Sequence, residues 1–334
     1  QRLERQTQEG RKAIFVSTPS SQASFLQRFV PRQLQVMSNG NKGAALVLAA
    51  TVLFSVMVLI IKLLGDRFSV PQIIFVRQLL MAAIMLPVIA DHFVDTFRSN
   101  APKLQALRVA LALASITIGF TAVIELPLAE STTIGFARSF FITLFAIWFL
   151  SEKVGIRRWT AVFVGFVGVV IVMRPGTDAF SIYSLYAFCA AATIGGVGIL
   201  NRKLAQLDGA QRTVTFLIVG VAIALGPFAI ANWVWPTFYE WLLFIALAGV
   251  TWSAQMLNVT GFKYGEASFL AGLDYIRLIF AVAFGWLFFG DVPDTTFYIG
   301  ATIIIGAAIY TIYREAKRQQ QLVSTPYNRA GNPN

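Results

Sequence analysis

Ten long apolar runs, separated by short polar or turn-forming breaks, constrain this chain more than any other feature of its sequence. The runs are 17 to 24 residues long, and a helix of about 20 residues crosses the ~30 Å hydrocarbon core of a bilayer. Because a segment in lipid must satisfy its own backbone hydrogen bonds, the runs are predicted to be helices rather than strands. The predicted spans are 44–64, 70–90, 104–124, 128–150, 158–174, 182–201, 212–232, 238–261, 266–289 and 296–313.

The composition agrees with an all-α integral membrane protein embedded in a lipid bilayer. Only 13% of the residues are charged, about half of the usual ~25% in soluble proteins, and the mean hydropathy is +0.67. The net charge of +11 therefore does not indicate a nucleic-acid partner. A single cysteine, Cys189, and a single histidine, His92, exclude an internal disulfide and multi-cysteine or multi-histidine metal sites. No GxxxxGK[ST] phosphate loop occurs, so neither a metal nor another cofactor is expected.

The distribution of basic residues predicts the orientation in the membrane. If the N-terminus is cytosolic and ten helices alternate, 21 of the 27 Lys and Arg residues fall inside, 3 fall outside and 3 lie within helices. Cytosolic loops carry such an excess of positive charge, so both termini are predicted to be cytosolic. Residues 1–42 are predicted to form a basic tail that is disordered or lies on a surface. An organellar transit peptide, or initiation at Met37 with residues 1–36 as upstream sequence, stays open.

The two halves of the chain resemble each other at a shift of 139 residues. Since each half holds five helices, an odd number, the second repeat is predicted to be inverted, as in transporters whose halves rock around a midplane site. The aligned pairs are Arg138 with Arg277, Glu152 with Asp291, Ala161 with Gly300, and Gly168 with Ala307. The predicted domains are a tail at 1–42, repeats at 43–175 and 182–314, and a cytosolic tail at 315–334. Small residues permit close helix packing in lipid, which is the role predicted for Gly165, Gly168, Gly300 and Gly306.

Three stretches resemble the EamA domain of the drug/metabolite transporter (DMT) superfamily. Two resemble the end of that domain: AESTTIGFARSFFITLFAIWFLSEKVGIRRWTAVFVGFVGVVIVMRPG and ASFLAGLDYIRLIFAVAFGWLFFGDVPDTTFYIGATIIIGAAIYTIYRE. The third, VPQIIFVRQLLMAAIML, resembles its second helix. The resemblance covers roughly residues 43–315 and implies a permease with ten helices in two inverted repeats around a central substrate cavity.

One departure from the family pattern concerns the middle of helices four and nine. Many members have proline there, whereas this chain has Arg138 and Arg277 close to that point. Substrates of proline-bearing relatives are therefore not transferred to this chain. The motifs YIR, FGDVP and YRE resemble a bacterial branch that includes riboflavin and other metabolite permeases, which implies a bacterial inner membrane.

Four charged residues fall inside the predicted spans: Arg77, Arg138, Asp274 and Arg277. Charge within a bilayer costs a few kcal/mol or more and is retained mainly where it meets water, a partner or a substrate. Asp274 and Arg277 are spaced i,i+3 and can pair, which leaves open that this pair only holds the bundle together. The four residues sum to a charge of +2, which favours a substrate with an anionic group. For Arg77, a place near the outer mouth, where it gates or bonds a broken helix end, is the alternative.

Polar and aromatic residues complete the predicted substrate site. Trp252, Gln255 and Asn258 share a stripe of the eighth helix. This stripe is predicted to face a pore, because amides that face lipid would be unsatisfied. Apolar walls are predicted from Tyr275, Trp148, Trp286 and Phe120.

The favoured function is a secondary transporter that moves a small organic metabolite by alternating access. An intramembrane enzyme is disfavoured, because the spans hold no paired carboxylates, histidine cluster or activated nucleophile. A non-transporting receptor or anchor is the other alternative, but it explains neither the repeat nor the intramembrane arginines. A monomer and a homodimer are both compatible with the sequence.

Overall fold

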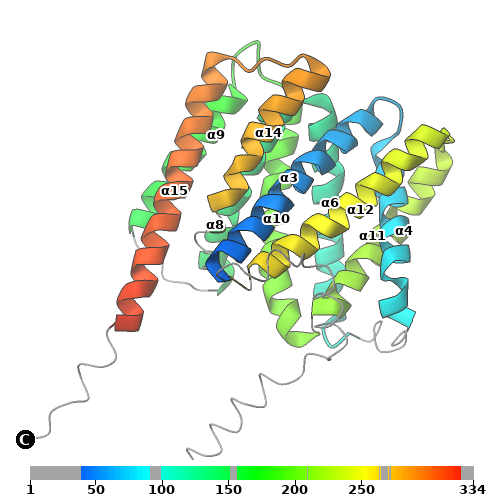
Figure 1. The fold of residues 1–334 in the computed structure, drawn as a ribbon, viewed down its shortest axis with the longest axis horizontal. Coiled ribbons are helices and arrows are strands. Elements are labelled where there is room, and N and C mark those ends of the chain that lie inside the picture. The colour runs from blue at the N-terminus through cyan, green and yellow to red at the C-terminus, as the bar shows by residue number, and fades with distance from the viewer. Residues whose placement is uncertain are drawn as a thin grey trace, which may run out of the picture.

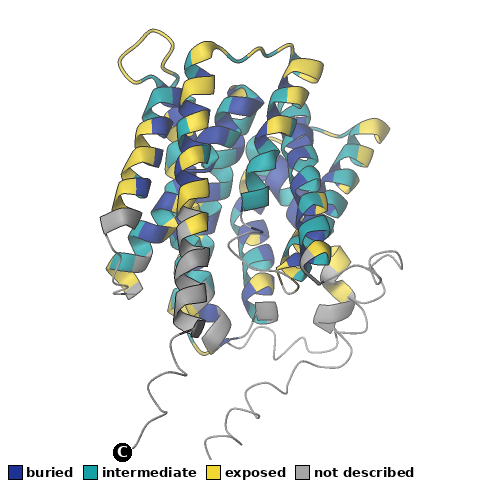
Figure 2. Ribbon diagram, turned by 60° about the vertical axis from the view of Figure 1, so that its left-hand side comes forward, coloured by how far each residue is buried: buried dark blue, intermediate teal, exposed yellow. Residues whose placement is uncertain are grey.

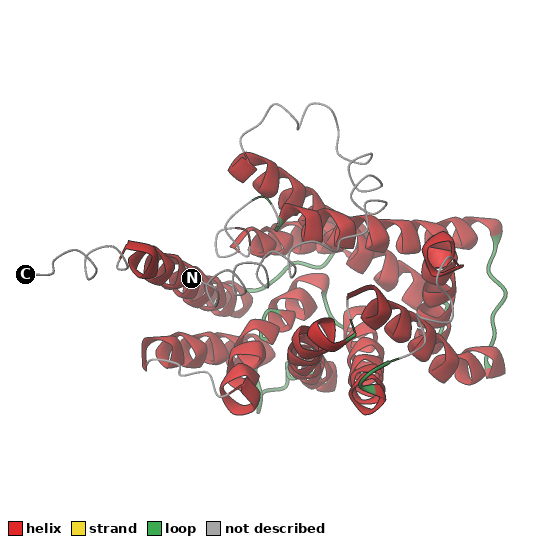
Figure 3. Ribbon diagram, turned by 90° about the horizontal axis from the view of Figure 1, so that it is seen from below, coloured by secondary structure: helices red, strands yellow, loops and turns green. Residues whose placement is uncertain are grey.

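The computed structural model describes residues 39–90, 99–150, 156–208, 210–262, 264, 270 and 272–324. All secondary structure in this part of the chain is helical (Figures 1 and 3). Most of the two predicted tails lies outside the described residues, although the last helix continues into the second tail as far as Ser324. The helices are α3 (Asn39–Gly65), α4 (Val70–Ala90), α6 (Pro102–Glu125), α7 (Leu128–Gly135), α8 (Arg138–Leu150), α9 (Ile156–Met173), α10 (Ile182–Leu207), α11 (Ala210–Ala231), α12 (Phe238–Gly261), the 3-10 turn η2 (Asp274–Ile276), α14 (Arg277–Phe284), the π-helical turn η3 (Gly285–Phe289) and α15 (Thr295–Ser324).

The helices cover the ten predicted spans in their described parts, although α3 begins five residues earlier, and α10 and α15 end six and 11 residues later than predicted. Within the described ranges, six helices are long and apolar enough to cross a membrane, and three shorter apolar helices lie in α4, α9 and α15. The fourth predicted span is divided into α7 and α8, and the ninth contains η2, α14 and η3. Large apolar side chains are exposed around the outside of the bundle (Figure 2), as expected for a surface that faces lipid. The protein is an all-α integral membrane protein.

Helix packing follows the internal repeat. Helix α6 packs along α10, and helix α3 packs along α12. A shift of 139 residues places α3 on α10 and α6 on α12, so the two pairs are equivalent in the repeat. The pairs α4–α11 and α9–α15 each join two counterparts, so the pseudo-two-fold axis passes between their members. This arrangement confirms the prediction of two inverted five-helix repeats.

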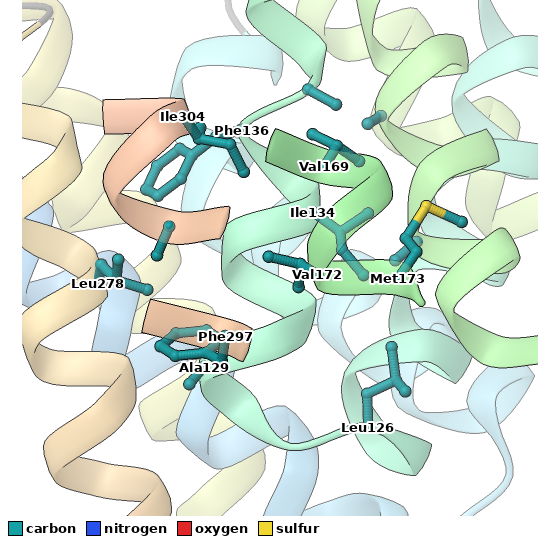
Figure 4. Packing of buried hydrophobic residues seen from close by; sticks show 14 of the residues in the cluster. Leu126, Ala129, Ile134, Phe136, Val169, Val172, Met173, Leu278, Phe297 and Ile304 are labelled. Carbon is teal, nitrogen blue, oxygen red and sulfur yellow. The ribbon is translucent and has the colours of Figure 1, made fainter. Parts of the chain in front are cut away.

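Small residues mediate the contact between α9 and α15. A Cβ atom on Gly300 would lie 2.8 Å from the carbonyl oxygen of Gly168, and one on Gly168 would lie 3.0 Å from that of Gly300. Gly165 also faces a close neighbour, the ring of Phe140, so three of the four glycine predictions are confirmed. The prediction for Gly306 is wrong, because no heavy atom lies within 4 Å of a Cβ atom placed there. Side chains of α7, α9, α14 and α15 fill the adjoining core (Figure 4).

A hydrogen-bonded carboxylate joins α6 and α10 at the predicted cytosolic end. Asp208, which follows the last residue of α10, accepts hydrogen bonds from the Ser99 hydroxyl (2.5 Å), the Asn100 backbone N–H (2.7 Å) and the Gln105 amide (2.9 Å). Burial opposes ionisation of Asp208, but these hydrogen bonds outweigh it and hold the pKa of the carboxyl below its usual value. At the opposite end of the bundle, Arg67 and Glu240 join α3 to α12 at the equivalent place, with Nη1 2.8 Å from the carboxylate.

Candidate functional site

The fourth and ninth spans are interrupted at the same point of the repeat. The α-helix α7 ends at Gly135, and α8 begins at Arg138 after a two-residue turn. In the second half the 3-10 turn η2 covers the counterparts of residues 135–137, and α14 begins at Arg277. Each arginine is therefore the first residue of the second part of a broken helix. In transporters, such breaks occur near the membrane midplane, where irregular backbone lines the binding site.

Asp274 connects these two arginines. Its Oδ2 accepts a hydrogen bond from Nη2 of Arg138, and its Oδ1 accepts one from Nη2 of Arg277 at 2.5 Å. The side chains of Arg138 and Asp274 are 32% and 26% exposed, whereas that of Arg277 is 12% exposed. These three residues, called the central triad below, have a net charge of +1 because one carboxylate is shared by two guanidinium groups.

The central triad corrects one sequence-based interpretation. From its spacing, Asp274 was expected to pair with Arg277, which would leave Arg138 without a carboxylate. In the structure Asp274 binds both arginines, although Arg138 is 136 residues away in the chain. The packing of α7 against α14 explains this, because it brings the two helix breaks together.

Aromatic rings border the central triad. The Arg277 guanidinium lies 4.8 Å from the centroid of the Phe54 ring, a cation–π geometry. The rings of Phe136 and Tyr275 are in contact, with centroids 4.6 Å apart. These two residues are counterparts at the shift of 139, so their contact lies on the pseudo-two-fold axis. Tyr275 thus lies beside the central triad, where the sequence predicted it.

The remaining predicted site residues lie elsewhere. Arg77 is buried beside Phe120, and among the described residues it makes no hydrogen bond or ion pair with the central triad. In the predicted stripe of the eighth helix, Trp252 packs against a cluster that includes Met81 of α4. Gln255 of the same stripe is exposed, and Asn258 is half-buried.

The predicted aromatic walls are partly wrong. Trp148 and Trp286 are 65% and 66% exposed on the surface of the bundle. Phe120 is buried and belongs to the core between α3, α4 and α6. A single apolar face could not be assigned from the sequence, because these spans are apolar on all sides.

A group of ion pairs that was not predicted lies at the predicted outer end of the bundle. Arg174 Nη2 lies 2.5 Å from Asp294 and 3.9 Å from Glu130. Lys62 Nζ donates to the Leu126 carbonyl oxygen at 2.5 Å and lies 3.8 Å from Asp291. These contacts are called the outer ion pairs below, and two of them, Arg174–Asp294 and Lys62–Asp291, join the two repeats. The signal that could have found them is that the few basic residues outside the membrane lie close to acidic turns.

Several bacterial proteins are similar to this chain over most of its length. A riboflavin transporter of Brucella anthropi is 27% identical over 75% of this chain and 92% of its own length. An S-adenosylmethionine uptake transporter of Rickettsia bellii is 26% identical over 78% of this chain and 90% of its own length. A pseudopaline exporter of Pseudomonas aeruginosa is 25% identical over 80% of this chain and 95% of its own length.

A solved crystal structure and a family profile complete the comparison. The crystal structure has a TM-score of 0.59 at 18% identity and covers 84% of this chain and 99% of its own, which supports the ten-helix fold. The profile of the EamA-like transporter family matches twice, at residues 41–174 and 181–313, one match for each repeat. The chain is therefore a multi-pass transporter of small metabolites rather than an enzyme, and it belongs to the EamA-like transporter family.

Proposed function

We propose that this protein is a secondary transporter that moves a small organic metabolite with an anionic group by alternating access. The central triad is the observation that carries this proposal, because it places a net charge of +1 at the paired helix breaks. Arg138 offers a planar set of donors that suits a carboxylate, sulfonate or phosphate group. Asp274 and Arg277 hold the site in shape, and Tyr275 and Phe54 provide apolar surface for the rest of the solute.

The charge of the site is the reason to favour an anion. An isolated charge at the centre of a bilayer costs a few kcal/mol or more, and one anionic group would neutralise the triad. The side chain of Arg138 is 32% exposed, more than that of Arg277, so Arg138 is the residue that the solute reaches. Relatives named for riboflavin, S-adenosylmethionine and pseudopaline support a small metabolite as cargo.

The difference between the two ends of the bundle supports alternating access. At the predicted outer end α3 meets α6, and the pairs Arg174–Asp294 and Lys62–Asp291 cross between the repeats. The counterpart of the α3–α6 contact is α10–α12, and these two helices have almost no contact between their described residues. Closure at one end and looser packing at the other is the geometry of a carrier that faces inward.

The proposed location is a bacterial inner membrane with both termini in the cytosol. In a Cys189→Ser background, a cysteine at Asp178 or Asp294 should react with an impermeant maleimide added to intact cells, because both positions are exposed at the predicted outer end. A cysteine at Lys203, which is exposed at the other end, should react only after the membrane is permeabilised. Labelling of the Lys203 position in intact cells would contradict the orientation.

Vesicle transport tests the function. Purified protein is first screened by thermal shift against monocarboxylates, sulfonates and phosphate monoesters, each paired with an uncharged amide or ester of the same shape. Anions that stabilise the protein are then used in flux assays in proteoliposomes. Arg138→Gln should reduce flux by about 30-fold, equal to ~2 kcal/mol for a lost charge-assisted hydrogen bond.

The control for this assay is Arg67→Gln, which removes a guanidinium from a surface ion pair and should leave flux within about twofold. Stabilisation by the uncharged partners as strong as that by the anions would contradict the anionic class. Wild-type flux by a folded Arg138→Gln, Arg277→Gln variant would remove the central triad from the mechanism.

A further inference from the structure

Arg77 is a buried cation that no carboxylate neutralises within the described residues. It is 8% exposed, and its Nη2 donates to Oε1 of the adjacent Gln78 at 3.3 Å. The guanidinium carbon lies 5.0 Å from the centroid of the Phe120 ring. Its Nε is buried without any acceptor. A group with five N–H donors therefore has one acceptor and one ring face as partners.

The side chain of Arg77 points into the protein rather than into lipid. Ile73, Ile74 and Met81, which share its face of α4, are buried, whereas Leu79 on the other side is 48% exposed. Arg77 follows the first residue of α4 by seven positions, which corresponds to about 10 Å along the helix axis. The guanidinium is thus in the predicted outer half of the bundle, between α4 and α6.

A second polar group beside Phe120 also lacks a partner. The Oγ1 atom of Thr117 is buried and makes no hydrogen bond. Thr117 precedes Phe120 by three residues in α6, so the two side chains share one face of that helix. The hydroxyl of α6 and the guanidinium of α4 therefore both leave donors unused close to Phe120.

Another buried arginine shows how a guanidinium without a carboxylate is normally satisfied. Arg108 is also buried, but its Nε donates to Oδ1 of Asn201 and its Nη1 donates to the Thr213 carbonyl oxygen at 2.6 Å. Arg77 has no comparable set of acceptors. A cation–π contact with Phe120 attracts the charge but accepts none of the in-plane N–H groups. The partner that the Arg77 guanidinium lacks is a hydrogen-bond acceptor, and an anionic acceptor would form the strongest hydrogen bonds with it.

We propose that Arg77, Thr117 and Phe120 form a second anion-binding site, separate from the central triad, that takes one small oxyanion group. A carboxylate or phosphate oxygen would receive the free N–H donors of Arg77 and the hydroxyl hydrogen of Thr117, and Phe120 would hold the guanidinium in place. The oxyanion is either a free ion or the anionic group of the transported solute. This proposal does not rest on the central triad as the substrate site.

Thermal unfolding of the purified full chain tests this site. Acetate and inorganic phosphate are titrated against the bulky HEPES anion at constant ionic strength, and the solute panel is titrated in parallel. A saturable rise in Tm with either small anion would show that a free ion is enough to occupy the site. A rise with anionic solutes alone would identify the group carried by the solute. No rise with any of these anions would overturn the proposal.

Variants assign the rise to this site. In an Arg138→Gln background, which removes the anion ligand proposed at the central triad, Arg77→Gln should abolish the remaining rise. In the same background Thr117→Val, which keeps the shape of the side chain, should raise the midpoint concentration about tenfold. A rise that persists in the Arg77→Gln, Arg138→Gln double variant would overturn the proposal. If Arg77→Gln yields no folded protein, the Thr117→Val midpoint decides, and an unchanged midpoint would refute the site.

Discussion

Replacing Gly300 with leucine should abolish the folded protein. The new Cβ atom would lie 2.8 Å from the Gly168 carbonyl oxygen and 3.2 Å from the Val172 backbone nitrogen. Backbone atoms cannot rotate away as a side chain can, so α15 would have to separate from α9. That separation would disturb the core around Phe297 and Ile304. We expect a loss of about 3 kcal/mol or more, at the upper end for overpacked cores, measured as monodisperse yield and Tm in detergent.

The same helix provides a matched control. Gly306→Leu makes the same chemical change one and a half turns further along α15, where a Cβ atom meets nothing within 4 Å. This variant should keep the wild-type yield and Tm. Equal losses in the two variants would show that helix flexibility, rather than the α9–α15 contact, requires glycine.

Asp274→Asn is expected to have a destabilising effect of similar size. The substitution preserves the shape of the side chain but leaves Arg138 and Arg277 without the carboxylate that they share. Removing one partner of a buried ion pair typically costs ~3–5 kcal/mol, because an uncompensated charge remains. The expected result is a large fall in Tm, with part of the loss recovered in the Asp274→Asn, Arg277→Gln double variant.

Asp294→Asn is the control for that experiment. Asp294 also pairs with an arginine, but its side chain is 47% exposed, and exposed pairs contribute only ~0–1 kcal/mol. The double-variant comparison tests coupling directly, since residues in one network give non-additive changes. Additive losses in Asp274→Asn and Arg277→Gln would show that the two side chains act independently.

The parts of the fold that local sequence determines were predicted correctly. Ten apolar runs require ten helices, because lipid leaves no other way to satisfy the backbone. Close helix packing at Gly168 and Gly300 was also predicted, since small residues recur at matching points of the repeat. In contrast, Gly306 shows that a small residue alone does not identify the face of a helix that is apolar on every side.

The candidate site was only partly predictable for a physical reason. The charges of Arg138, Asp274 and Arg277 stand out against an apolar background, so their importance is visible in the sequence. Their pairing depends on how two helices 136 residues apart meet, which no local pattern encodes. The same applies to the outer ion pairs, whose partners are brought together by loops at the ends of different helices.

The contact between Phe136 and Tyr275 has a consequence for the energy of the carrier at rest. Two counterparts that touch place the symmetry axis between them, and a carrier with identical halves would populate its two facing states equally. Here the counterpart of Asp274 is Gly135, which has no carboxylate to offer. When the halves exchange roles, the only acidic member of the central triad stays with one of them. In the proposed alternating-access mechanism, the two empty states would therefore differ in free energy and in population.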